Sequence, residues 1–152
     1  MKQPATQFDL DRFLPYLLTR LANRASRELA GVYETRFGIS VPEWRVIAHL
    51  AQNRKVSVRE IHERVDMDKV RVSRAAARLE GIGLIEKRVN ATDRRLVELS
   101  LTRKGHRMFK QIAPLALAYE RKMLNGLSSA DERNFRRCID QLLARPGAND
   151  RS

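Results

Sequence analysis

The chain has 152 residues, 43% of them hydrophobic, which is enough for one domain with a packed core, or for a small domain with helical extensions. Thirty Lys and Arg against eighteen Asp and Glu leave a net charge of +12, and such a surface favours nucleic acid or an acidic membrane as its partner. No apolar run approaches the roughly 20 residues that span a bilayer, the N-terminus lacks a secretory signal, and a single cysteine excludes an internal disulfide framework. We therefore expect a cytoplasmic protein with no membrane partner.

The first predicted element is a long helix over residues 10–36. Leucine, alanine and valine recur there at three- and four-residue steps, which is the period of an apolar stripe on a helix. Gly38 is expected to end this helix in the left-handed conformation that favours glycine. A second helix is predicted to begin at Val41, with Pro42 in its first turn, and to end at Asn53.

Two shorter helices are predicted next, joined by a tight turn. Ser57 and Glu60 form a capping-box pattern at the start of a helix that runs from Val58 to Val65. Asp66-Met67-Asp68 is the predicted turn, and Asp68 is a natural N-cap for a helix that runs to Glu80. A turn of three or four residues between two helices is typical of the DNA-binding helix-turn-helix, whose second helix enters the major groove.

The pattern then changes from helical to alternating. Residues 85–89 and 97–101 alternate in polarity as two half-buried strands do, with a polar loop between them. Thr102 is expected to cap another long helix, which Pro114 should bend. Ser128-Ser129-Ala130-Asp131 is interpreted as a second capping box that opens a last helix.

This order of elements predicts a mostly α (α+β) fold, a winged helix-turn-helix with long N- and C-terminal dimerisation helices and a two-stranded wing. The DNA-binding domain is expected over residues 41–102 and the helical dimerisation region over residues 10–36 and 103–145. Residues 146–152 are expected to form a disordered tail. A dimer is indicated because the apolar stripes of the terminal helices are too extensive for one small winged domain to cover.

The second helix of the pair has two distinct faces. Val72, Ala76 and Leu79 lie on one side and should pack inward. The opposite side carries cations, a hydroxyl and a small apolar group, a set that suits base edges and flanking phosphates. Arg74 is expected to make a bidentate contact to guanine. The alternative is a basic face that is merely solvated.

The loop between the strands is the second expected contact. A ribbon tip that carries Arg94 and Arg95 can enter a narrow minor groove, where the negative potential is enhanced. Asp93 repels phosphate, but it can hold Arg95 in one orientation by a charge-assisted pair. The alternative is an ordinary charged hairpin turn. The expected DNA-binding residues are Ser57, Lys69, Val70, Arg71, Ser73, Arg74, Arg78, Asp93, Arg94 and Arg95.

These residues carry a resemblance to a known family. Asp93-Arg94-Arg95, followed by residues 97–102 and Gly105, resembles the wing signature of the MarR family, the multiple antibiotic resistance regulators. Residues 72–74 and 79–85 resemble that family's recognition helix and its exit, and the resemblance in order and length covers residues 10–143. Asn90 is a mild departure, since many members have an acidic residue there.

The resemblance implies a winged helix-turn-helix transcriptional regulator that is an obligate homodimer, formed by the N-terminal helix and the two C-terminal helices. It also implies that Arg95 is the minor-groove arginine and that Asp93 orients it. Two-fold symmetry would separate the two reading helices by about 34 Å, so the partner would be double-stranded DNA with a roughly palindromic operator.

Members of this family commonly respond to small aromatic acids, sometimes to their CoA thioesters, which implies a small-molecule effector here. Arg24 lies on or beside the apolar stripe of the first helix, and Trp44 opens the second. An arginine at the rim of an aromatic-walled pocket could pair with a ligand carboxylate, which makes these two residues candidate effector ligands. The alternatives are an Arg24–Glu28 pair within the helix and a salt bridge between subunits.

The remaining chemistry-bearing residues predict no catalytic, metal or cofactor site. His49, His62 and His106 lack the spacing of metal ligands, and nothing activates Cys138, which is expected to be a packed core residue. An enzyme would need converging catalytic groups or a phosphate-cradling glycine loop, and seven scattered glycines supply neither. The remaining alternative is a non-specific architectural DNA-binding protein, which would more typically carry apolar wedge residues than Arg74 and Ser73.

Overall fold

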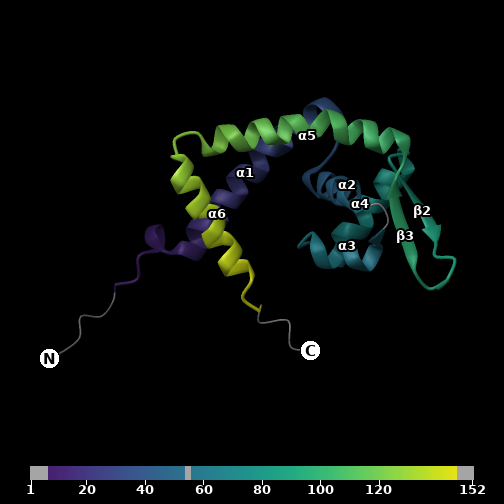
Figure 1. The fold of residues 1–152 in the computed structure, drawn as a ribbon, viewed down its shortest axis with the longest axis horizontal. Helices are drawn as coiled ribbons and strands as arrows, with labels where there is room; N and C mark the ends of the chain where they lie inside the picture. The colour runs from purple at the N-terminus through teal and green to yellow at the C-terminus, as the bar shows by residue number, and fades with distance from the viewer. Residues whose placement is uncertain (1–6, 54–55, 147–152) are drawn as a thin grey trace. The chain divides into compact units, whose positions relative to one another are not determined.

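The computed structural model describes residues 7–53 and 56–146 (Figure 1). The chain divides after Leu115 into two compact units. Most of the expected tail, residues 147–152, lies outside the described residues. None of the helices in the described part of the chain is long and apolar enough to cross a membrane.

The N-terminal helix begins later than its apolar stripe suggests. A single 3-10 turn, Leu10–Arg12, precedes helix α1, Leu14–Phe37. Phe13 between them is extended, and Pro15 lies in the first turn of α1, where a missing backbone N–H costs nothing. The expected helix over residues 10–36 is therefore two elements. Gly38 ends α1 with φ 63°, as predicted.

Helix α2, Val41–Gln52, is capped at both ends. Asn53 closes it as predicted, and Pro42 occupies its first turn. Its N-terminus carries a capping box that the sequence reasoning missed. The Ser40 hydroxyl accepts from the Glu43 amide at 3.3 Å, and the Glu43 carboxylate accepts from the Ser40 amide at 3.2 Å.

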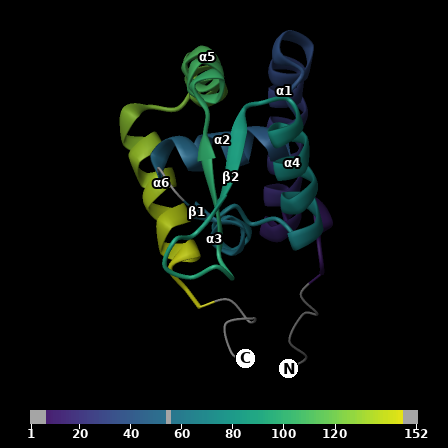
Figure 2. The same ribbon diagram turned by 90° about the vertical axis from the view of Figure 1, so that its right-hand side faces the viewer.

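The helix-turn-helix and the wing form as predicted. Helices α3, Val58–Arg64, and α4, Lys69–Gly81, are followed by strands β2, Ile85–Val89, and β3, Val97–Leu101. A third strand was not predicted: β1, Val56–Ser57 (labelled in Figure 2), pairs with the other edge of β3, so the antiparallel sheet has the order β1-β3-β2. The expected two-stranded wing is thus a hairpin in a three-stranded sheet. Two residues are too few to show an alternating pattern.

The core of the first unit lies between α2, α4 and the sheet, and α1 and helix α5, Arg103–Leu124, add one fully buried side chain each. The fully buried side chains include Tyr33, Ile39, Val46, Ile47, Leu50, Val56, Ile61, Val72, Leu79, Leu84, Ile85, Leu99 and Ile112. Trp44 lies between two aromatic rings, with ring centroids 5.3 Å from Tyr33 and 5.7 Å from Phe109. Burial raises the pKa of Tyr33 to about 12.

The start of helix α5, Arg103–Leu124, is locked onto the exit of α4. Thr102 donates its hydroxyl to the Gly83 carbonyl at 2.6 Å and accepts from the Gly105 amide at 3.1 Å, which confirms it as the cap. A Cβ at Gly105 would lie 2.1 Å from the Leu84 carbonyl oxygen. Only glycine allows so close an approach. Pro114 lies inside α5, and the bend expected there stays a prediction.

The second unit contains the end of α5 and helix α6, Ser129–Leu143. The Ser128 hydroxyl accepts from the Asp131 amide at 3.1 Å, as predicted. The Asp131 carboxylate binds that same hydroxyl at 2.8 Å, whereas a complete capping box would use the Ser128 amide. Arg136 bridges Glu120 at 2.8 Å and Glu132 at 3.0 Å.

No residue of α6 is buried, although its sequence is strongly amphipathic. Leu127, Ile139, Leu142 and Leu143 are all exposed. Cys138 is exposed as well, so the expectation of a packed core cysteine is wrong for this chain. The reason is that α6 has no buried residue, so no core forms around Cys138 within the described part of the second unit.

Candidate nucleic-acid interface

The turn between α3 and α4 sets the direction of the second helix. The Asp68 carboxylate accepts from the Arg71 amide at 2.9 Å, which confirms Asp68 as the N-cap. Asp66 has φ 50°, a left-handed conformation that aspartate tolerates better than most residues. Met67 points inward, and its carbonyl meets His62 Nδ1 at 2.8 Å. These contacts hold the start of α4 beside α3.

Helix α4 has the two faces that the sequence predicts. Val72, Ala76 and Leu79 are buried, and Ala75 is buried with them. The opposite face is exposed. Val70 lies among its polar residues, and 58% of its surface is accessible to solvent although it is apolar. The exposed residues on this face are Lys69, Val70, Arg71, Ser73 and Arg74. Four donors around one small apolar group can meet both base edges and phosphates.

Arg78 differs from the other cations of α4 because its partners lie on α2 and at the end of α1, although 51% of its side chain stays exposed. Its Nη1 donates to the Glu43 carboxylate and its Nη2 donates to the Gly38 carbonyl at 3.0 Å. Glu43 is the sole charged residue in the core that the described residues form, with 6% of its surface accessible. Arg78 was expected among the DNA-facing cations, and the structure instead directs two of its donors toward the junction of α1 and α2.

The wing loop is held by side chains at its base. The Asn90 carbonyl oxygen accepts from the Thr92 amide at 2.8 Å and from the Asp93 amide at 3.0 Å. Its amide nitrogen donates to Glu98 at 2.6 Å. An asparagine can donate and accept at once, whereas an ionised carboxylate only accepts. Asn90 therefore ties the loop to β3, a role that the sequence comparison alone did not suggest.

The predicted pair at the wing tip is present. Asp93 Oδ1 accepts from the Arg95 backbone amide at 3.1 Å and from Arg95 Nε at 3.2 Å. The Arg95 side chain is 91% exposed and the Asp93 side chain 39% exposed. The carboxylate therefore fixes the near part of the arginine and leaves the far end of the guanidinium toward solvent. Arg94 is exposed beside it.

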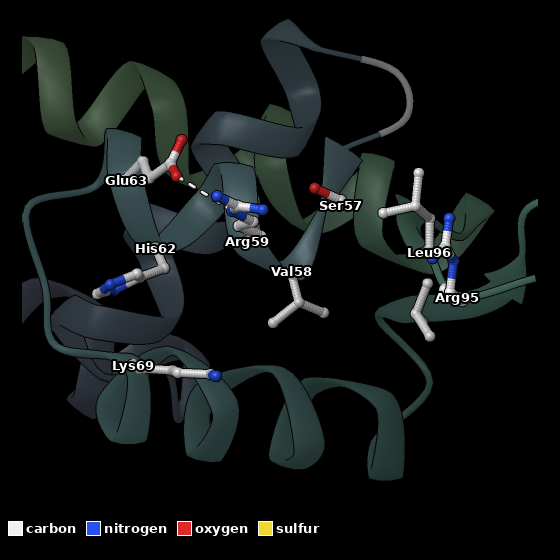
Figure 3. Close-up of a pocket in the computed structure, with 9 residues that line it drawn as sticks. Ser57, Val58, Arg59, His62, Glu63, Lys69, Arg95 and Leu96 are labelled. Carbon is white, nitrogen blue, oxygen red and sulfur yellow. Dashed lines mark ion pairs between the residues drawn. The ribbon is translucent and has the colours of Figure 1, made fainter. Parts of the chain in front are cut away.

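A pocket of about 740 Å³ joins the helix pair to the wing (Figure 3). Ser57, Lys69 and Arg95, three of the expected contacts, line it together. The Ser57 hydroxyl accepts from the Glu60 amide at 3.1 Å, which is the hydroxyl half of the predicted capping box. Arg59 also lines the pocket, 3.4 Å from Glu63, and sequence reasoning missed it. The only feature of the sequence that pointed to Arg59 was its position, two residues after the N-cap Ser57.

The two candidate effector ligands lie in different places. Arg24 Nε is 3.1 Å from Glu28, so the intrahelical pair that was the alternative reading is formed. Arg24 borders a pocket of about 450 Å³ on α1, together with Arg20 and Arg27. Trp44 borders another, beside His49. Burial and the nearby Arg64 lower the pKa of His49, against a smaller opposing effect of Glu60.

Comparisons with known proteins agree with this arrangement. The model of the MarR family matches residues 37–96. The transcriptional repressor MdtR of Bacillus subtilis is 35% identical over 75 residues, 49% of this chain and 48% of its own, so the chain spans about half the length of this relative. A MarR/EmrR family transcriptional regulator from Acinetobacter sp. ADP1 has a TM-score of 0.83 at 26% identity, covering 90% of this chain and 96% of that one.

A third comparison is with Bordetella bronchiseptica BpsR, whose DNA binding is regulated by 6-hydroxynicotinic acid. Its TM-score is 0.83 at 17% identity, covering 91% of this chain and 99% of that one, which shows a common fold. The matched residues of the family model include α2, the helix pair and the whole wing loop. The chain therefore resembles the MarR family of transcriptional regulators, in sequence over residues 37–96 and in fold over most of its length.

Proposed function

We propose that the protein is a dimeric, sequence-specific repressor that binds double-stranded DNA. The observation that carries this proposal is the exposed face of α4, which follows an N-capped turn in helix-turn-helix order. Residues 41–102 form the DNA-binding domain in this proposal, and residues 10–36 and 103–145 the dimerisation region.

The candidate DNA contacts have separate proposed roles. Arg74 reads a guanine edge, with Val70 and Ser73 beside it. Lys69, Arg71 and Ser57 contact phosphates, and Arg59 joins them because it lines the same pocket as Ser57 and Lys69. Arg94 and Arg95 enter the minor groove, where a narrow groove attracts arginine.

The dimer is supported by apolar side chains that nothing covers in the single chain. In the first unit, Leu10, Leu14, Leu18 and Leu21 are exposed, and in the second Leu117, Leu127, Ile139, Leu142 and Leu143 are exposed. Solvated patches of this kind mark association surfaces. A two-fold axis then gives two reading helices about 34 Å apart and a palindromic operator. Sedimentation equilibrium should show twice the chain mass of 17.5 kDa, and a single-chain mass would refute the symmetric operator.

The effector is proposed to be a small aromatic acid or its CoA thioester that releases the repressor from DNA. BpsR provides a precedent on the same fold. Arg24, with Arg20 and Arg27 beside it, offers a cationic rim that suits a carboxylate, and Trp44 offers an aromatic wall. Because the two border different pockets, they would serve one ligand only if that ligand bridges both or the pockets join on binding. A thermal-shift screen with aromatic acids tests this, since a ligand of the folded state raises the melting temperature.

The experiment on DNA compares two duplexes of equal length, one selected from a random library by the wild-type protein and one of random sequence. Arg74→Ala should cost ~1–3 kcal/mol on the selected duplex. The loss on random DNA should be much smaller, because non-specific affinity comes from phosphates. Val72, Ala76 and Leu79 stay in place, so a circular dichroism melt should be unchanged.

Equal losses on both duplexes would make Arg74 a phosphate contact, and base reading would move to Lys69, Val70 or Ser73. A wild-type protein that selects no sequence at all would instead support the architectural alternative.

A further inference from the structure

The contact between Arg78 and the α1–α2 junction is unlike any other made by a cation of α4. Arg78 Nη1 donates to the Glu43 carboxylate, and Nη2 donates to the Gly38 carbonyl. The partners lie 35 and 40 residues earlier in the chain. One guanidinium therefore bonds to both ends of the short connection between α1 and α2.

Each end of that connection is also a helix terminus with a defined geometry. Gly38 ends α1 in the left-handed conformation, with φ 63°. The Glu43 carboxylate caps α2 by accepting from the Ser40 amide at 3.2 Å, with the same oxygen that meets Arg78. Arg78 thus connects the recognition helix to two helix termini, and a displacement of α4 would break both contacts together.

The chemistry of the pair favours a structural link over a loose surface contact. Glu43 is buried, and a buried carboxylate is costly unless it is paired and hydrogen-bonded. The planar guanidinium presents two donors in a fixed geometry, so it can meet a carboxylate and a carbonyl at once. A lysine ammonium is a single point charge and does not reproduce that fork.

We propose that Arg78 is a positioning residue, which with Glu43 holds α4 in the orientation that base reading requires, and that it is not a phosphate contact. The inference rests on the proposed function, because it concerns how that DNA-binding helix is aimed. Arg78 lies one helical turn after Arg74, so loss of its contacts would change where Arg74 points without changing the number of phosphate-facing charges.

Four single variants separate the two roles: Arg78→Ala, Arg78→Lys, Glu43→Gln and, as the matched control, Arg71→Ala on the exposed face. Binding is measured on the selected duplex and on random DNA over a series of salt concentrations. A phosphate contact gives a salt slope that falls by about one and a similar loss on both duplexes when it is removed. Arg71→Ala should behave in that way.

A positioning role for Arg78 predicts a different pattern. Arg78→Ala should weaken binding to the selected duplex by about 2- to 30-fold, the range seen for coupling residues that do not touch a ligand, and should leave the salt slope unchanged. Random DNA should change by much less. Glu43→Gln should show the same loss of selectivity although it makes the protein more positive, and Arg78→Lys should recover little of it. A variant that combines Arg78→Ala with Glu43→Gln should lose no more affinity for the selected duplex than the weaker-binding of the two single variants.

The opposite pattern would overturn the proposal. If Arg78→Lys restores wild-type binding while Glu43→Gln leaves binding unchanged or tighter, Arg78 acts through its charge on phosphate. If affinity for both duplexes falls in proportion to the fraction of unfolded protein, measured by circular dichroism, Arg78 and Glu43 only stabilise the fold. These outcomes leave the proposed function intact provided Arg74→Ala still loses selectivity, whereas failure of the wild-type protein to select a duplex would refute both.

Discussion

Replacing Asp93 by alanine tests whether the wing is ordered before it meets DNA. In the structure one carboxylate oxygen accepts from both the backbone amide and the Nε of Arg95, at 3.1 and 3.2 Å. The substitution removes both contacts and leaves the guanidinium free to sample other rotamers. It also removes a negative charge that faces phosphate, so the two effects on affinity have opposite signs.

The magnitudes decide the sign. Immobilising one flexible side chain at an interface costs about 0.5–1.5 kcal/mol. Because Asp93 already holds Arg95 in the free protein, DNA binding does not incur this ordering cost. Repulsion between a carboxylate and a phosphate at about 7 Å in water is about 0.6 kcal/mol, and screening at physiological ionic strength reduces it to about 0.25 kcal/mol. Ordering is the larger effect. Asp93→Ala should therefore weaken binding by about 0.3–1.3 kcal/mol per wing, or about 2- to 9-fold.

The assay is a titration of the selected duplex at one fixed salt concentration, with Arg95→Ala and the Asp93/Arg95 double variant as controls. Arg95→Ala should weaken binding and lower the salt slope, since one cation leaves the phosphate field. The double variant should bind no more weakly than Arg95→Ala alone, because Asp93 acts through Arg95. Tighter binding by Asp93→Ala would refute the orienting role and leave simple charge repulsion as the dominant effect.

Three further predictions concern stability. Gly105→Ala should lower the free energy of unfolding by about 1–3 kcal/mol, because its Cβ would overlap the Leu84 carbonyl. The control Gly31→Ala has nothing near its Cβ and should be neutral or stabilising. Equal urea midpoints for the two variants would contradict this prediction. The pKa of His49 is lowered in the folded state, so the unfolded chain binds the proton first and stability should fall as pH drops below 6.5, a dependence that His49→Gln should flatten in thermal melts. The pKa of Tyr33 is raised to about 12, so stability should fall as pH rises above 10, and Tyr33→Phe should abolish that loss; an unchanged alkaline profile would argue against burial as the cause.

The parts of the site that were predicted correctly depend on local signals. Asp68 caps α4 because its carboxylate reaches an amide three residues on, and such a bond can form wherever that short segment turns. The faces of α4 follow from the 3.6-residue period of a helix, which puts Val72, Ala76 and Leu79 on one side. Asp93 and Arg95 are two residues apart, so their pairing needs only the loop itself. Interactions over so short a range are already specified by the residue types.

The contacts that were missed or misjudged join residues far apart in the chain. Strand β1 has two residues and exists because β3 offers it an edge. Arg78 looks like the other cations of α4 in the sequence, but the fold brings Glu43 and Gly38 beside it while half of its side chain stays exposed. Arg24 and Trp44 seemed candidates for one pocket, and the packing of α1 and α2 puts them in two.

The sequence by itself thus determined the order of elements, the two faces of α4 and the paired residues of the wing, because each depends on neighbours within a few positions. Only the tertiary structure decided which cation of α4 pairs with a buried carboxylate. That choice depends on a buried carboxylate 35 residues away, whose need for a partner is a property of the assembled core and of no local pattern.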